Sequence, residues 1–415
     1  MEIKRDIYVE RLKRRMGNQQ IKVITGIRRC GKSYLLFRLF KRFLLEQGVP
    51  QDHIIEIEFD RRRNAPLLNP DAACAFIDSR LGKEGKYYLL LDEVQLLEDF
   101  ESVLNDYLHI DNLDIYVTGS NSKFLSTDII TEFAGRGDEI HVLPLSYREF
   151  LPAASGIENP WSDYLTFGGL PQVLTRQSDA DKSEYLKSLF QKVYIKDVIR
   201  RNKIKHHPEE IEELLEILAS SVGSLTNPLN LENAFRSIKK TAISRGTLGK
   251  YCRCLEEAFL IHKARRYDVK GKKYINTPLK YYFEDVGLRN ALLNFRQTEE
   301  NHLMENIVYN ELRFRGYNVD VGVVEMRDHS AKLDRKALEI DFVANLGSKR
   351  YYIQSAFTMP DDAKREQENR PLRHTGDSFR KIIVTGDNTR ICRNNDGHTL
   401  MNIQDFLLNP DSLDL

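Results

Sequence analysis

The sequence predicts an α/β fold in which a parallel sheet carries helices on both faces. Over the first 150 residues, short β-rich runs alternate with helical stretches, which is the pattern of a parallel sheet with crossover helices. The first run is followed directly by the spacing G-x-x-x-x-G-K-S at residues 26–33. That spacing, between a strand and a helix, is typical of a phosphate-binding loop. Together the two observations predict a nucleotide-binding sheet at the N-terminal end.

Five apolar runs are the expected strands of this sheet. They are Ile21–Ile24, Ile54–Phe59, Tyr87–Leu91, Ile115–Thr118 and Ile140–Leu143. Segments with helical character lie between them: Ser33–Leu45, Ala72–Leu81, Phe100–Leu108 and Ser122–Phe133. Pro144 and Pro152 mark a change of character, so we expect the first domain to cover residues 1–150.

The rest of the chain is expected to form three parts. Residues 151–204 are a helical lid or linker, since apolar residues from Tyr185 onward recur at three- and four-residue steps. Residues 205–298 form a compact helical domain. Residues 299–415 return to a mixed pattern, with one helix and then four strands. These are Met304–Arg315, followed by Val319–Val324, Glu339–Val343, Tyr351–Ser355 and Lys381–Thr385.

The loop residues fit the chemistry of phosphate binding. Gly26 and Gly31 let the backbone curl with its N–H groups inward, Lys32 reaches the β- and γ-phosphates, and the Ser33 hydroxyl ligates Mg²⁺. The alternative is a chance glycine turn before an ordinary helix. The residues expected at the nucleotide are Gly26, Ile27, Arg28, Arg29, Cys30, Gly31, Lys32, Ser33 and Tyr34.

Two carboxylates follow the hydrophobic run that ends at Leu91. Asp92 is expected to hold Mg²⁺ through water, and Glu93 to orient and polarise the attacking water. An acidic surface pair after a buried strand is the alternative. Next to the phosphate-binding loop, the pattern favours a hydrolytic site.

Two further positions are candidates for this site. Asn121, or Ser120, follows the next strand and could hydrogen-bond the water or the γ-phosphate, although a plain strand-to-turn transition explains the pattern too. Arg136 lies between two glycines before the last strand. A guanidinium there could stabilise the charge of phosphoryl transfer, in the same subunit or in a neighbouring one, or be an ordinary loop arginine.

These motifs, in this order, resemble a family of bacterial and archaeal AAA+-type ATPases with an appended C-terminal domain of unknown function. The resemblance also includes Pro144-Leu145-Ser146-Tyr147-Arg148-Glu149-Phe150 and covers nearly the whole chain. It implies ATP rather than GTP as the nucleotide. In agreement, the sequence contains no N-K-x-D guanine-reading motif.

Residues 205–298 are expected to form a winged helix. Three short helical stretches end in Gly246–Phe259, a candidate recognition helix capped by Ser244 or Thr247. Leu260–Ala264 and Lys273–Ile275 are the expected wing strands. The wing carries Arg265, Arg266, Lys270, Lys272 and Lys273. Such a wing suits phosphate contacts on double-stranded DNA, or it is a solvated hairpin on a domain that contacts proteins.

The last domain resembles a PD-(D/E)xK nuclease that has lost ligands. Glu305 on a helix, Asp341 in a strand and Gln354 in the next strand keep the order of that motif. Ala356 stands where the lysine is expected, and Gln354 replaces an acid, so metal-assisted cleavage is poorly supported. We expect a restriction-endonuclease-like α/β fold used for binding, without cleavage.

Composition narrows the class of protein. A charged fraction of 30% describes a soluble globular protein, and no apolar stretch is long enough for a membrane helix. The five scattered cysteines favour free thiols in a reducing cytosol. A net charge of +1 means that DNA binding must come from a local patch. The leading hypothesis is a Mg²⁺-dependent ATPase that moves a DNA- or protein-binding module. A nucleotide-dependent switch or scaffold with little turnover and an ATP-gated nuclease are the alternatives. Arg136 acting between subunits would require a homo-oligomer.

Overall fold

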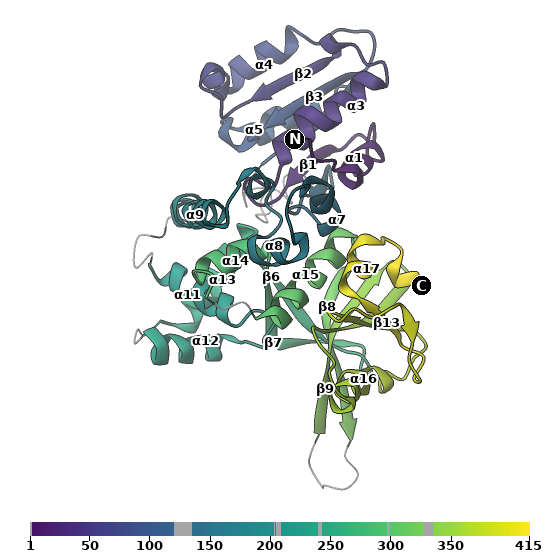
Figure 1. Cartoon of the computed structure of the whole chain (residues 1–415). Coiled ribbons are helices and arrows are strands. Elements are labelled where there is room, and N and C mark those ends of the chain that lie inside the picture. The colour runs from purple at the N-terminus through teal and green to yellow at the C-terminus, as the bar shows by residue number, and fades with distance from the viewer. Residues whose placement is uncertain are drawn as a thin grey trace. The chain divides into compact units, whose positions relative to one another are not determined.

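The computed structural model describes residues 2–119, 135–202, 204, 209–239, 243–296, 299–327 and 335–415. The chain forms two compact units (Figure 1). Unit 1 contains the residues up to Pro144 together with Glu257–Phe259, and unit 2 contains Leu145–Glu256 and Leu260–Leu415. Asn121, Ser120 and the helix expected at Ser122–Phe133 lie outside the described residues.

Unit 1 is built on a five-stranded parallel sheet, which confirms the predicted sheet. The strand order is β2-β3-β4-β1-β5. The strands are β1 (Ile21–Thr25), β2 (Ile54–Glu58), β3 (Tyr87–Asp92), β4 (Leu113–Thr118) and β5 (Gly137–His141). β1 lies between β4 and β5 and runs parallel to both. The loop that follows β1 therefore emerges at the carboxyl edge of the sheet, where ligands of such sheets bind.

Helices cover both faces of this sheet. They are α1 (Asp6–Lys13), a continuous helix made of α2 (Lys32–Tyr34), η1 (Leu35–Phe40) and α3 (Lys41–Glu46), and then α4 (Pro70–Asp78) and α5 (Phe100–Tyr107). Short 3-10 segments are η2 (Gln51–His53), η3 (Arg62–Leu68) and η4 (Val94–Leu96). Ile77 and Leu104 pack with Leu89 on one face, whereas the Phe40 ring lies 4.6 Å from that of Tyr116 on the other.

Unit 2 begins with helices and short turns. They are α7 (Tyr147–Phe150), η6 (Leu151–Ala153), α8 (Pro160–Phe167), η7 (Pro171–Thr175), α9 (Asp179–Leu189), η8 (Phe190–Ile195), α10 (Lys196–Arg201), α11 (Glu209–Ser220), α12 (Pro228–Ala234), η9 (Phe235–Lys239), α13 (Arg245–Glu257) and α14 (Val286–Leu292). α13 is the expected recognition helix. Its N-cap is Ser244, whose hydroxyl accepts a hydrogen bond from the Thr247 N–H (3.1 Å).

An eight-stranded mixed sheet forms the centre of unit 2, in the order β12-β13-β11-β10-β9-β8-β6-β7. Its strands are β6 (Ile261–Asp268), β7 (Lys273–Phe283), β8 (Asn318–Arg327), β9 (Arg335–Leu346), β10 (Lys349–Ala356), β11 (Arg380–Thr385), β12 (Cys392–Arg393) and β13 (Thr399–Asn402). The accompanying helices are α15 (Glu300–Phe314), α16 (Asp362–Arg373), α17 (Ile403–Leu408) and η10 (Ser412–Asp414).

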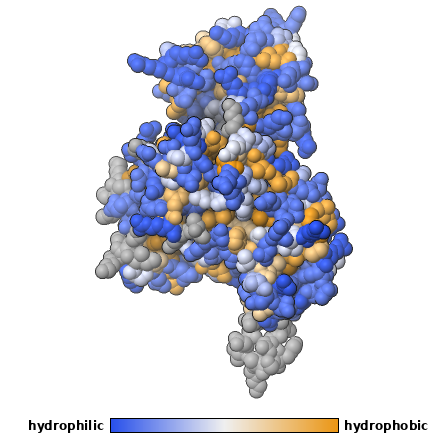
Figure 2. Space-filling view, in the orientation of Figure 1, coloured by the Kyte–Doolittle hydropathy of each residue, from blue (hydrophilic) through white to orange (hydrophobic). Residues whose placement is uncertain are grey.

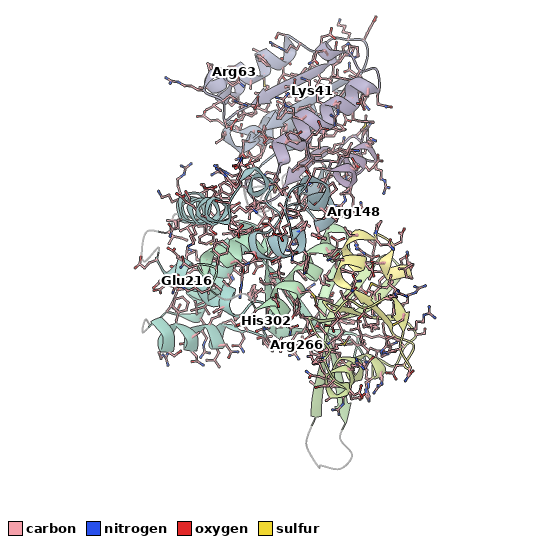
Figure 3. The ribbon with its side chains drawn as sticks, in the orientation of Figure 1. Lys41, Arg63, Arg148, Glu216, Arg266 and His302 are labelled. Atoms are coloured by element: carbon pink, nitrogen blue, oxygen red, sulfur yellow. The ribbon has the colours of Figure 1, made fainter. Side chains whose placement is uncertain are left out.

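The expected wing strands join this large sheet instead of standing in a small domain of their own. β6 pairs with β8 in parallel, with Arg266 opposite Val321, and β7 continues past the expected Ile275 to Phe283. The sequence gives no sign of this pairing because the partners are far apart in the chain. Arg266, labelled in Figure 3, therefore lies on a strand of the eight-stranded sheet.

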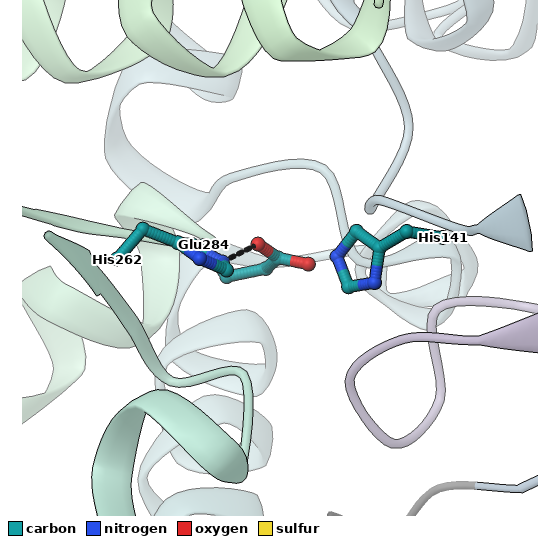
Figure 4. A group of neighbouring side chains, drawn as sticks. All are labelled: His141, His262 and Glu284. Atoms are coloured by element: carbon teal, nitrogen blue, oxygen red, sulfur yellow. Dashed lines mark hydrogen bonds and ion pairs between the residues drawn. The ribbon is translucent and has the colours of Figure 1, made fainter. Parts of the chain in front are cut away.

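A buried ion pair fixes the β6–β7 hairpin to α15. His262 Nε2 hydrogen-bonds Glu284, as Figure 4 shows. Arg313 of α15 contacts the same carboxylate (NH1–Oε2 3.1 Å). Glu284 is buried, so the charge of Arg313 compensates a carboxylate that would be costly to bury alone.

Polar and apolar residues are distributed as expected for globular units. Hydrophilic residues make up most of the face of each unit that Figure 2 shows, with hydrophobic residues between them. Within the described part of the chain, no helix is both long and apolar enough to cross a membrane.

Candidate functional site

The loop after β1 has the backbone of a cradle for an anion. Gly26 has φ 138°, and a Cβ there would lie 2.2 Å from the Val142 carbonyl oxygen, so only glycine fits. Gly31, with φ 104°, is the N-cap of α2, and Arg29 also adopts a positive φ of 64°. The loop therefore turns sharply into a helix whose first N–H groups remain for a ligand.

Lys32 places an ammonium group inside this cradle. Its side chain is buried, and Nζ donates to the carbonyl oxygens of Gly26 (2.8 Å) and Ile27 (3.0 Å). These contacts hold the charge at the loop itself. A buried ammonium beside a helix N-terminus fits a phosphate group.

Asp92 lies next to the loop at the end of β3. It is buried and accepts hydrogen bonds from Ser33 Oγ (2.9 Å) and from Thr118 Oγ1. Burial raises the pKa of Asp92, although the two hydrogen bonds favour the carboxylate. A buried carboxylate beside a hydroxyl is a suitable donor set for Mg²⁺.

Glu93 is held at both its backbone and its side chain. Its backbone lies in the left-handed region (φ 51°, ψ 44°), and its N–H donates to Thr118 Oγ1 (3.2 Å). The carboxylate accepts a hydrogen bond from Gln95 Nε2. Glu93 is therefore held by two neighbours, Thr118 at its backbone N–H and Gln95 at its carboxylate.

Two more acids lie beside Asp92. Glu58 ends β2, Asp60 follows it, and one oxygen from each of these three carboxylates lies within 4.8 Å of the others. The parallel register that pairs Glu58 with Asp92 explains the approach. The edge of the sheet thus concentrates negative charge opposite Lys32 and the helix N-terminus.

The structure sorts the remaining loop residues by accessibility. The side chains of Ile27 and Cys30 are buried, so a ligand in solvent cannot contact them directly. Arg28 is half-buried, whereas Arg29, Ser33 and Tyr34 are exposed. This pattern of burial agrees with a loop that binds through backbone groups, Lys32 and Ser33.

Arg136 lies apart from this group. The backbone N–H of Ile21, the first residue of β1, donates to the Arg136 carbonyl (2.8 Å), whereas the phosphate-binding loop follows the last residue of the same strand. β1 has five residues, so a strand length of roughly 17 Å separates Arg136 from the loop. The exposed guanidinium contacts Asn105 Oδ1 (3.4 Å).

Arg5 also holds the phosphate-binding loop in place, and the sequence does not predict this role. Arg5 is buried just before α1, and its guanidinium donates to the carbonyl oxygens of Cys30 (3.1 Å) and Leu143 (2.6 Å). It ties the phosphate-binding loop to the segment after β5. No motif marks this arginine, since its partners are backbone atoms.

In unit 2, the nuclease-like residues meet around a lysine from another strand. Lys280 of β7 is buried, with Nζ 2.9 Å from Glu305, 2.8 Å from Glu339 and 3.8 Å from Asp341. Burial disfavours the ammonium, but the three carboxylates outweigh it and raise the pKa of Lys280. Gln354 Oε1 accepts a hydrogen bond from the Asp341 N–H (3.1 Å).

The features of unit 1 define a class of protein. A five-stranded parallel sheet, a glycine cradle with a buried lysine after β1 and a carboxylate pair after β3 are those of a P-loop nucleotide-binding domain of the AAA type. Residues 18–151 match the family model described as AAA domain. Residues 158–299 match a domain of unknown function (DUF8612).

Comparison with known proteins identifies the family. An uncharacterized protein of Haemophilus influenzae is 33% identical over 98% of both chains. One of Methanocaldococcus jannaschii is 27% identical over 84% of this chain and 77% of its own. The chain belongs to the family of AAA-domain proteins that includes the Haemophilus influenzae protein.

A solved structure agrees with the fold. A Walker-type ATPase of Pyrococcus abyssi, 17% identical, matches 70% of this chain and 96% of its own with a TM-score of 0.50. At this identity the match concerns the fold alone. It agrees with a P-loop nucleotide-binding fold for unit 1.

Proposed function

We propose that the chain is a Mg²⁺-dependent ATPase that converts ATP and water to ADP and phosphate and uses this reaction to move a DNA- or protein-binding module. The observation that carries the proposal is the convergence of Lys32, Ser33 and Asp92 at the glycine cradle. A cation, a hydroxyl and a buried carboxylate at one helix N-terminus match the charges of a nucleotide with its metal ion.

Each residue has a role in this proposal. The amides of 26–33 and the Lys32 ammonium bind the β- and γ-phosphates, while Ser33 and Asp92 would hold Mg²⁺, which would neutralise charge on the phosphate oxygens. Glu93 orients the attacking water and accepts its proton. Asn121 or Ser120 remains a predicted contact of the water or the γ-phosphate.

Arg136 enters the proposal only between subunits. Since it lies a strand length from the loop of its own chain, it would have to reach the nucleotide of a neighbouring copy. A homo-oligomer is then part of the mechanism. Arg136→Ala should lower turnover without changing ATP binding by isolated subunits, and mixing it with an inactive Lys32→Ala chain should restore activity if the arginine acts in trans.

The basic experiment separates binding from hydrolysis. We expect Lys32→Ala to abolish binding of a fluorescent ATP analogue, since the buried ammonium is lost. Glu93→Gln should bind ATP normally and lose turnover by at least about 100-fold. Unchanged turnover in Glu93→Gln would remove Glu93 from its role, and unchanged binding in Lys32→Ala would contradict the site itself.

The moved module is proposed to be unit 2, with a lid at 151–204, a winged-helix part at 205–298 whose hairpin strands continue the large sheet, and a nuclease-like part at 299–415. Support for a nucleic-acid partner comes from the β6–β7 hairpin. Its residues Arg265, Lys270, Lys272 and Lys273 are exposed, and Arg265 stacks over the exposed Tyr274 ring at 4.1 Å. Exposed cations with an aromatic ring suit a phosphate backbone. A protein partner is the alternative.

We propose that the polar cluster of the nuclease-like part is a structural ion cluster. The Lys280 ammonium already satisfies Glu305 and Glu339 at hydrogen-bond distance. We therefore expect no plasmid nicking in Mg²⁺ or Mn²⁺, with Asp341→Ala as the control. Nicking by the wild-type chain that Asp341→Ala abolishes would show an ATP-gated nuclease instead.

The second candidate function is a nucleotide-dependent switch or scaffold with little turnover. The ATPase rate with and without duplex DNA, single-stranded DNA and RNA distinguishes the two. Stimulation by one of them would identify the class of partner. ATP binding with no turnover under any of these conditions would favour the switch.

A further inference from the structure

Gln95 stands next to the Glu93 carboxylate in η4. Its side chain is half-buried, and its Nε2 donates to Glu93 Oε2. An ionised carboxylate only accepts hydrogen bonds, so the amide atom that faces it must be the NH₂ group. The carbonyl oxygen Oε1 consequently points away from that contact.

The contact completes a frame around Glu93. A left-handed backbone is strained in a non-glycine residue, and here it persists with the Glu93 N–H bonded to Thr118. Thr118 also donates to Asp92. The backbone of Glu93 is thus fixed by one neighbour and its carboxylate by another. Such double restraint is what a base needs to meet a water at one defined place.

The other end of the amide is left for a ligand. Gln95 Oε1 is buried, and none of the described residues donates a hydrogen bond to it. A buried acceptor without a donor is destabilising, and water is the usual partner in such places. Oε1 and Nε2 are bonded to the same carbon, so a water that bonds Oε1 on the side of Nε2 would be within reach of the Glu93 carboxylate as well.

We propose that Gln95 is a positioning residue for the attacking water, pinning the Glu93 carboxylate through Nε2 and accepting a hydrogen bond from the water through Oε1. This inference rests on the proposed ATPase function. In the reaction the water oxygen forms a bond to the γ-phosphorus. The bond from that phosphorus to the bridging oxygen breaks, and its electron pair leaves with ADP. Glu93 takes one proton of the water, while the other points to Gln95.

The test is a separation of kcat from KM. Gln95→Ala removes both contacts, and we expect kcat to fall about 10- to 100-fold, the equivalent of one hydrogen bond to a charged group. KM for ATP and the affinity for ADP should not change. Gln95→Glu keeps an oxygen for the water but faces Glu93 with a like charge, so its kcat should fall too. Gln47→Ala, an exposed glutamine of the same unit, is the matched control.

A double-mutant cycle separates this role from a structural one. Because Gln95 and Glu93 are proposed to hold the same water together, Gln95→Ala should reduce the residual rate of Glu93→Gln much less than it reduces the wild-type rate. Three outcomes would overturn this inference and leave the proposed ATPase function intact. They are additive losses of rate in the double variant, a rise in KM that accounts for the lower activity of Gln95→Ala, and normal turnover in Gln95→Ala. No turnover in the wild-type chain would overturn the proposed function, and this inference with it.

Discussion

Thr118 is the residue on which the two acids of the site converge. It is buried, its hydroxyl donates to Asp92, and the same oxygen accepts from the Glu93 N–H (3.2 Å). Its place at the end of β4 brings it next to the end of β3, where both acids lie. One hydroxyl therefore couples the expected metal ligand to the expected base.

We expect Thr118→Val to lower kcat at least tenfold, because a methyl group of similar size cannot replace either hydrogen bond. The loss of the Thr118 hydrogen bonds to Asp92 and to the Glu93 N–H should also reduce the free energy of unfolding by about 1–3 kcal/mol. Steady-state kinetics and urea denaturation measure the two effects. Thr118→Ser keeps the hydroxyl and is the control. Equal kinetics for the valine and serine variants would contradict the coupling.

The site residues that sequence reasoning found belong to contiguous motifs. Lys32, Ser33, Asp92 and Glu93 stand at fixed offsets from a strand end, so their approach follows from parallel topology. Thr118 is the last residue of an expected strand, yet nothing in the sequence distinguishes it from the polar residues that follow. Its hydroxyl is important because the neighbouring strands β3 and β4 bring it within hydrogen-bond distance of Asp92 and Glu93.

At the scale of elements, α1 serves the phosphate-binding loop although it lies outside every motif. Arg5 immediately before the helix bonds the carbonyl oxygens of Cys30 and Leu143. Tyr8 of the same helix accepts a hydrogen bond from the Leu143 N–H (3.0 Å). Arg5 and Tyr8 thus attach the N-terminal helix to the phosphate-binding loop and to the segment after β5.

Arg5→Ala should loosen the loop and weaken ATP binding about tenfold, the equivalent of about 1.4 kcal/mol. The physical reason is that two buried carbonyl groups lose their donor. Titration with a fluorescent ATP analogue checks the result. Lys4→Ala, an exposed cation one residue away, should bind like the wild-type chain. Normal ATP binding by the Arg5 variant would show that the loop holds its shape without this anchor.

The elements differ in how well the sequence predicts them, for physical reasons. The strands of unit 1 are buried apolar runs, so their pattern is strong. α16 has no such pattern: its residues are mostly polar, and Pro371 lies inside it. The one available signal was its N-cap, since Asp361 accepts a hydrogen bond from the Lys364 N–H (2.7 Å).

α15 carries a titratable group that should make stability depend on pH. Burial raises the pKa of Glu311 to about 7, although its ion pair with Arg315 (2.7 Å) opposes the shift. A raised pKa means that folding favours the protonated acid. Its contribution to the free energy of unfolding is therefore fully present below its ordinary pKa and is lost as the pH rises through about 7.

Glu311→Gln removes this dependence. We expect the wild-type chain to lose about 1–3 kcal/mol of unfolding free energy relative to the variant between pH 5 and pH 8. Urea denaturation of both proteins across that range measures the difference. Glu366→Gln, an exposed glutamate of the same unit, should follow the wild-type curve. A difference that does not change with pH would contradict the shifted pKa.

At the scale of the whole molecule, the sequence predicts separate domains at 205–298 and 299–415, whereas their strands form one sheet in the structure. The hairpin and the strands of the last part form one sheet, because β6 pairs with β8. Lys280 reaches Glu305 and Asp341 through the same arrangement. Neither contact leaves a local pattern, since the partners are 25 and more residues apart. Domain boundaries drawn from composition cannot register such pairings, and the four-part division remains a prediction.

From the β6–β7 hairpin we predict that unit 2 binds duplex DNA. Lys270 and Lys272 are exposed at its turn, so a Lys270→Ala/Lys272→Ala chain should bind duplex DNA more weakly. The slope of log affinity against log salt should become less steep by up to about 1.8, because two phosphate contacts are lost. The matched control removes two exposed cations that are already paired with acids, Lys349 with Asp414 and Arg365 with Asp362. Fluorescence anisotropy at several salt concentrations measures both variants. Equal slopes for the hairpin variant and the wild-type chain would assign the hairpin to a protein partner instead.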